Sequence, residues 1–152
     1  MSIIVRGKSV LGPNVVTDGL VLYLDAGNVK SYPGTGTVWS DLSGDGNNGD
    51  LINGITYSSG NLLFDGSIDY VDCGTKASLD ITPNVTLETF VNFPSFTVYG
   101  GFIAKRTEGP ALGNYYFRTA NGIGQFQLGH NPGSHQIWIT NKTDFAINTC
   151  YT

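Results

Sequence analysis

The sequence has little charge and no long apolar run, and both absences exclude kinds of partner. Only 13% of its 152 residues are charged, and the 8 Lys and Arg residues form no basic cluster. Because clustered cations are what track a phosphate backbone, we expect no nucleic-acid partner at a net charge of −4. No apolar run approaches the roughly 20 residues that span a bilayer, so we expect no membrane insertion. Residues 1–5 are apolar but too few for a signal-peptide core, so we expect no secretion of the chain by itself.

Cysteine is equally scarce, with Cys73 and Cys150 as its two representatives. We favour two buried, reduced thiols, because unpaired cysteine is among the most buried residue types. A single disulfide between them is the alternative. In either case, two cysteines in 152 residues do not make a disulfide framework.

Glycine and aromatic residues are the abundant features, with 21 Gly, 8 Tyr, 8 Phe and 2 Trp. Clusters of Gly, Asn, Asp and Ser separate short apolar runs, which is typical of a chain that turns often. No amphipathic helix, internal repeat or linker is evident. The sequence therefore predicts a single all-β domain, either a sandwich or a barrel.

Alternating or continuous apolar runs mark the predicted strands. Residues 20–24 form a nearly continuous apolar run, as in a buried strand, whereas residues 86–93 alternate with a period of two. We predict residues 1–16 to be an N-terminal arm that pairs either within the domain or on a neighbouring subunit. The remaining predicted strands are residues 50–52, 55–58, 61–65, 69–72, 102–105, 115–118, 124–128 and 136–140.

Oxygen-bearing side chains gather in the turn-rich segments and suggest a structural Ca²⁺, a cation that takes 6–8 oxygen ligands. Residues 44–49 also match GxGxxG, but strands and no helix follow, which argues against a nucleotide site. The alternative to a metal is Asx-turn chemistry alone. The candidate Ca²⁺ ligands are Asp25, Asp41, Asp45, Asn47 and Asp69.

Catalytic patterns are missing, and the aromatic residues suggest binding instead. Glycoside hydrolysis needs two carboxyl groups across the scissile bond, but Glu88 and Glu108 are the only glutamates and neither has a close acidic neighbour. We therefore expect no enzyme and assign no catalytic residue. Exposed aromatic rings suit sugar faces, although core or subunit contacts are the favoured explanation for each ring. The candidate glycan-binding residues are Tyr99, Tyr115, Tyr116 and Trp138.

Three ordered blocks resemble laminin G-like, concanavalin A-like domains. They are TDGLVLYLDAGN at residues 17–28, WSDLSGDGNNG at 39–49 and LFDGSIDYV at 63–71. The resemblance implies a jelly-roll sandwich of two antiparallel sheets over residues 17–152. This variant is similar to domains in virion proteins of tailed phages, especially cyanophages, where they serve as tail-fibre, tail-associated or capsid-decorating components.

Two departures from the family shape the functional expectation. The acidic strand of the glucanase members is missing, so the resemblance implies a lectin-like or structural member. Residues 147–151 resemble a family strand after which further strands normally follow, so we expect an incomplete jelly roll that neighbouring subunits complete. We therefore expect a structural virion protein, a homo-oligomer in contact with other virion subunits and with host polysaccharide. The alternative is a carbohydrate-binding, lectin-like module of a bacterial surface or secreted protein.

Overall fold

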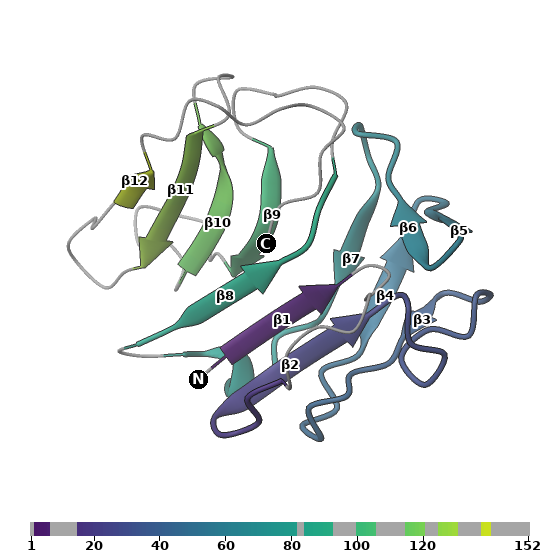
Figure 1. The fold of residues 1–152 in the computed structure, drawn as a ribbon, viewed down its shortest axis with the longest axis horizontal. Helices are drawn as coiled ribbons and strands as arrows, with labels where there is room; N and C mark the ends of the chain where they lie inside the picture. The colour runs from purple at the N-terminus through teal and green to yellow at the C-terminus, as the bar shows by residue number, and fades with distance from the viewer. Residues whose placement is uncertain are drawn as a thin grey trace. The chain divides into compact units, whose positions relative to one another are not determined.

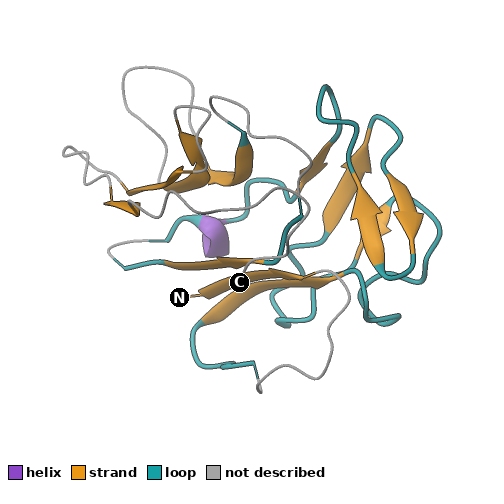
Figure 2. Ribbon diagram, turned by 45° about the horizontal axis from the view of Figure 1, so that its top comes forward, coloured by secondary structure: helices purple, strands orange, loops and turns teal. Residues whose placement is uncertain are grey.

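The computed structural model describes residues 2–6, 15–81, 84–92, 100–105, 115–120, 125–130 and 138–140, and over these ranges the protein is all-β (Figures 1 and 2). The only helix among them is the 3₁₀ turn η1 (Ala77–Leu79). Among the described residues, no helix has the length and apolar character needed to cross a membrane. Contacts within the chain group into two compact units, which are described separately: Met1–Asp80 with Glu88–Phe90, and Ile81–Leu87 with Val91–Thr152.

A three-stranded sheet contains the N-terminal segment of the chain. Its order is β2 (Leu20–Asp25), β1 (Ser2–Arg6) and β8 (Thr86–Thr89). Of the two alternatives for the arm, the structure therefore shows pairing within the chain. β1 runs parallel to β2, which differs from the antiparallel sheets expected from the sequence. Most of β2 is buried, in keeping with its continuous apolar run and with a parallel strand covered on both faces.

A second sheet of the first unit consists of β3 (Val38–Trp39), β4 (Gly49–Ile52) and β7 (Tyr70–Asp72), in the antiparallel order β3-β4-β7. Its strands alternate between a buried and an exposed face. Gly49 lies on the buried face, where a Cβ atom would collide with Cγ1 of Val71 and touch Leu24 of β2. Glycine at this position thus allows β4 to pack closely against the neighbouring strands.

A hairpin follows, formed by β5 (Thr56–Ser58) and β6 (Asn61–Leu63). Ser59 and Gly60 make its two-residue turn with φ of 50° and 84°. Positive φ at both positions matches the twist of a tight hairpin, and it confirms the turn predicted there from the sequence. The ring of Tyr57 in β5 packs on that of Tyr32, with centroids 5.3 Å apart.

The second unit holds an antiparallel sheet in the order β12-β11-β10-β9. The rings of Phe102 and Phe117 meet edge to face across β9 and β10, with centroids 5.4 Å apart. These are the strands predicted at 102–105, 115–118, 124–128 and 136–140, with small shifts of their ends. Their bounds are β9 (Gly101–Lys105), β10 (Tyr115–Ala120), β11 (Gln125–His130) and β12 (Trp138–Thr140).

Candidate functional site

Asp41 is the centre of the loop between β3 and β4. Its Oδ1 accepts hydrogen bonds from the backbone N–H groups of Tyr23 and Ser43, both at 2.9 Å. Its Oδ2 accepts from the Ser43 hydroxyl at 2.7 Å and from the N–H of Asn47 at 2.9 Å. A carboxylate offers about four acceptor positions. All four are therefore used in holding this loop against β2.

Asn47 extends the same network into the interior, where it is only 1% exposed. Its Nδ2 donates to the carbonyl of Val21 at 2.7 Å and to Oγ of Ser78 at 3.0 Å. The Ser78 hydroxyl in turn donates to Oδ1 of Asn47 at 3.1 Å. One amide thus ties the loop to β2 and to η1, and we call Asp41 and Asn47 together the loop hub.

The carboxylates of the other three candidate Ca²⁺ ligands make no hydrogen bond to the loop hub among the described residues. Asp25 is buried at the end of β2, and its carboxylate accepts from the N–H of Gly27 at 2.9 Å and from the Tyr23 hydroxyl at 3.2 Å. Asp45 is exposed. Asp69 belongs to the loop before β7, where Oδ2 accepts from the N–H of Asp65 at 2.9 Å. Its Oδ1 is buried and has no hydrogen-bond partner among the described residues.

These five residues do not fit a shared Ca²⁺ site. The structure joins Asp41 and Asn47 as hydrogen-bond partners, and their oxygens already accept protein donors instead of converging on a cation. In the described ranges, no three His, Cys, Asp or Glu side chains form a group that could hold a metal ion. The Asx-turn alternative therefore accounts for Asp41, whose Oδ1 bonds the N–H two residues ahead.

The structure describes the side chains of two of the four candidate glycan-binding residues, and these two differ in their surroundings. Tyr115 must be corrected, because its side chain is 2% exposed and cannot offer a ring to a ligand. The burial pattern of β10 shows why: Tyr115 and Thr119 share the more buried face, whereas Tyr116 alternates to the other. The Arg118 guanidinium lies 4.7 Å from the ring centroid of Tyr116 and covers part of it. Tyr99 and the side chain of Trp138 lie outside the described residues.

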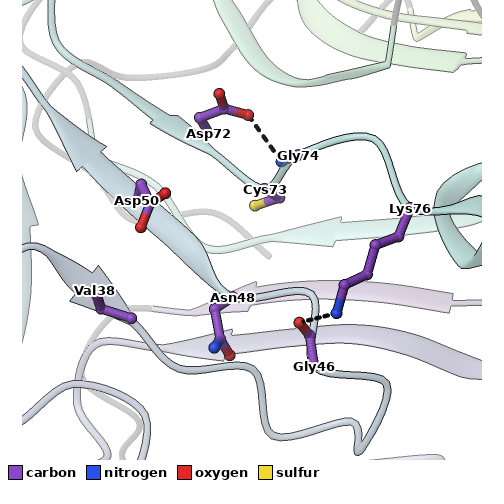
Figure 3. Close-up of a pocket in the computed structure, with 8 residues that line it drawn as sticks. All are labelled: Val38, Gly46, Asn48, Asp50, Asp72, Cys73, Gly74 and Lys76. Atoms are coloured by element: carbon purple, nitrogen blue, oxygen red, sulfur yellow. Dashed lines mark hydrogen bonds between the residues drawn. The ribbon is translucent and has the colours of Figure 1, made fainter.

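A polar pocket on the exposed face of the β3-β4-β7 sheet was not predicted from the sequence (Figure 3). Its volume is about 400 Å³. Strand register places Val38, Asp50 and Asp72 in one row across the three strands. The strands at 50–52 and 69–72 were predicted, but their pairing depends on residues far apart in the chain, so the row could not be foreseen. The pocket is lined by Val38, Gly46, Asn48, Asp50, Asp72, Cys73, Gly74 and Lys76.

The charges of the pocket are arranged unevenly. Lys76 reaches across to the loop and donates to the carbonyl of Gly46 at 2.6 Å and to that of Asp45 at 3.4 Å. Its ammonium is therefore fixed by backbone oxygens. Burial, reinforced by the negative charges of Asp72, Asp41 and Asp50, raises the pKa of the Cys73 thiol to about 11. Cys73 is a free thiol, and protonated at neutral pH it is a poor nucleophile.

No family model, curated protein or solved structure matches the chain.

Proposed function

We propose that this chain is a non-enzymatic structural component of a phage virion, built as a concanavalin A-like jelly-roll sandwich. It would act as a tail-fibre, tail-associated or capsid-decorating subunit in contact with further copies of itself. The resemblance of residues 17–28, 39–49 and 63–71 to the laminin G-like blocks supports this assignment, as does the all-β fold.

The observation that carries the proposal is an apolar surface cluster around the loop between β6 and β7. Four large apolar side chains there are 49–60% exposed. No Lys or Arg occurs from residue 56 to residue 70. Large exposed apolar side chains are what the core of a protein interface offers. The members of this apolar cluster are Leu63, Phe64, Ile68 and Tyr70.

A second copy of the chain is the partner that this composition favours. The acidic charges of the loop, Asp65 and Asp69, would repel nucleic acid or an anionic membrane, whereas an apolar surface of the same kind would cover the cluster. Sedimentation over a range of protein concentrations tests this. We expect reversible association of the wild type, and a monomer for the double variant Phe64→Ser, Ile68→Ser.

Val29→Ser supplies the matched control, because Val29 is also highly exposed in the first unit but lies outside the apolar cluster. It should associate as the wild type does. A monodisperse wild-type monomer at every concentration would exclude the assembly role. The virion assignment itself requires the chain to be found at fixed stoichiometry in purified particles by mass spectrometry.

The second candidate is a carbohydrate-binding, lectin-like module of a bacterial surface or secreted protein. The polar pocket on the β3-β4-β7 sheet favours it, because several hydrogen-bonding side chains converge on one small open cavity. The two candidates are separable, since the apolar cluster and the pocket share no residue.

A further inference from the structure

Asn-Gly pairs occur at either end of β4, and the structure places them in contrasting surroundings. We propose that Asn53-Gly54 is a site of spontaneous deamidation, that Asn48-Gly49 is protected from it, and that the change at Asn53 releases the loop of residues 64–69. This loop contributes to the apolar cluster. The modification site follows from local geometry, whereas its effect on self-association rests on the proposed assembly role.

Deamidation at an Asn-Gly pair needs only water. The backbone nitrogen of Gly54 loses its proton to water or hydroxide and attacks Cγ of Asn53, and the side-chain nitrogen takes up a proton and leaves as ammonia. Water then opens the succinimide ring at either carbonyl, which leaves aspartate or isoaspartate at position 53. No oxidation or reduction occurs. Glycine hinders the attack least, because it has no Cβ and moves freely between backbone conformations.

Asn53 and Gly54 have room to reach the geometry of attack. Both are exposed and lie in the connection between β4 and β5, outside either strand (Figure 1). In the described part of the chain, the Gly54 N–H donates no hydrogen bond, and a Cβ on Gly54 would meet no atom within 4 Å. Asn53 has a φ of 68°, a left-handed conformation that costs a non-glycine residue free energy. Rotation of this peptide group therefore relieves strain and displaces no packed side chain.

The Asn48-Gly49 pair is held in place on both sides. Gly49 is buried in β4, and a Cβ there would collide with Cγ1 of Val71, so its peptide group has no room to turn. Oδ1 of Asn48 accepts the N–H of Asp41 at 2.9 Å. Attack at this pair therefore requires the sheet to open, whereas attack at Asn53 requires only the turn to move.

The Asn53 amide also links this turn to the loop of residues 64–69. Its Nδ2 donates to the carbonyl of Ile68 at 2.7 Å. A carboxylate has no N–H to donate, so after deamidation an anionic oxygen would face that carbonyl. Asp65 and Asp69 already make the loop acidic, and a further negative charge beside them adds repulsion. The loop would then move away from the turn, and the apolar cluster would lose the fixed position of Ile68.

The modification is tested by incubating the folded full chain at mildly alkaline pH and sampling it over time. Digestion at acidic pH stops the reaction, and tandem mass spectrometry locates the mass increase that accompanies loss of ammonia. We expect conversion in the folded protein to be at least about tenfold faster at Asn53 than at Asn48, with similar rates at the two positions in urea. Asn53→Gln should stay unconverted at position 53, because its longer side chain must close a larger ring. Equal rates in the folded protein, or faster conversion at Asn48, would overturn the assignment of the site.

Release of the loop is tested with Asn53→Asp, which reproduces the aspartate product. Amide hydrogen exchange at residues 67–69 should become at least about threefold faster, and self-association in sedimentation should weaken by about threefold or more. Asn48→Asp is the matched control, because it makes the same change at an exposed position and keeps an acceptor for the N–H of Asp41. It should leave both measurements unchanged. Unchanged exchange in Asn53→Asp would overturn the release of the loop.

The exchange and conversion measurements need no association. If the wild type is a monomer at every concentration, the assembly role fails, while these two measurements still decide whether Asn53 is a modification site that holds the loop. If the wild type associates and Asn53→Asp associates equally well, control of assembly by this site is wrong, although the assembly role stands.

Discussion

Two Asp- and Gly-rich loops of the first unit use similar residues in contrasting ways. In the loop of residues 40–48, the loop hub has short-range bonds from Ser43 and between Asp41 and Asn47, and further bonds to partners 18, 26 and 31 positions away in the sequence. In the loop of residues 64–69, Oδ1 of Asp65 accepts three backbone N–H bonds, all from residues two to four positions ahead. The first loop is therefore part of the scaffold through its bonds to β2 and η1. The second loop is held mainly by its own residues, with one bond from outside it, donated by Nδ2 of Asn53 to the Ile68 carbonyl at 2.7 Å.

The two loops also differ in how exposed their residues are. Asn47 is buried, and the polar pocket opens beside it. The second loop is mostly exposed and presents the apolar side chains of Phe64 and Ile68. Its backbone is held by Asp65, whose pKa is lowered by the N–H groups of Ser67 first and then of Asp69 and Ile68. A locally closed loop of this kind can tolerate changes of its surface residues without loss of the fold.

The largest effect should come from Asn47→Ala. The change removes the partners of the Val21 carbonyl and of Ser78 in the interior, and we expect unfolding to become easier by about 3 kcal/mol. Asn48→Ala is the matched control, because Asn48 is exposed and its side chain makes one hydrogen bond among the described residues; the change should cost about 1 kcal/mol or less. Urea unfolding measures both. If both substitutions lowered the free energy of unfolding equally, the buried side chain of Asn47 would contribute no more to stability than the exposed side chain of Asn48.

Asp41→Asn should have the next largest effect. An amide keeps the shape of the carboxylate, but its NH₂ group would face an N–H donor in either orientation, because both oxygens accept such bonds. We expect a loss of about 2 kcal/mol in urea unfolding. Asp65→Asn serves as the control in the second loop, and its loss should be clearly smaller because its carboxylate is exposed. If the two substitutions destabilise the protein equally, the distinction between scaffold and surface loop is wrong.

The reactivity of the Cys73 thiol tests the burial of the region around the first loop. Its pKa is raised from 9.0 to about 11, first by burial and then by the negative charges of Asp72, Asp41 and Asp50. The folded state therefore favours the protonated thiol, so its contribution to stability is complete below pH 9 and is lost as the pH rises toward 11. Iodoacetamide should alkylate Cys73, followed in the peptide that carries it because the chain also has Cys150, more slowly at pH 8 in the native protein than in urea. Equal rates in the two conditions would contradict the burial of this thiol.

Local patterns were readable from the sequence, and long-range ones were not. Alternation and apolar runs predicted most strands, and Ser59-Gly60 predicted its hairpin turn, because each depends on neighbouring residues. The two-residue strand β3 is too short to carry a period and was missed. The role of Asn47 depends on Val21 and Ser78, which no local spacing links to it. For the same reason Asp41 and Asn47 were candidates for Ca²⁺ although they are internal hydrogen-bond partners.

The smallest effect concerns the pH response of the second loop. Because the pKa of Asp65 lies below its ordinary value of 3.8, its bonds to the loop N–H groups stabilise the fold above that pH and are lost as the pH falls through the lowered pKa. Amide resonances of Ser67 and Ile68 should therefore titrate with a midpoint below 3.8. The same resonances should not titrate in Asp65→Asn. A midpoint at or above 3.8 would show that these three N–H bonds do not stabilise the charged carboxylate of Asp65. The Asp65 carboxylate would then not be what holds the backbone of the second loop in place.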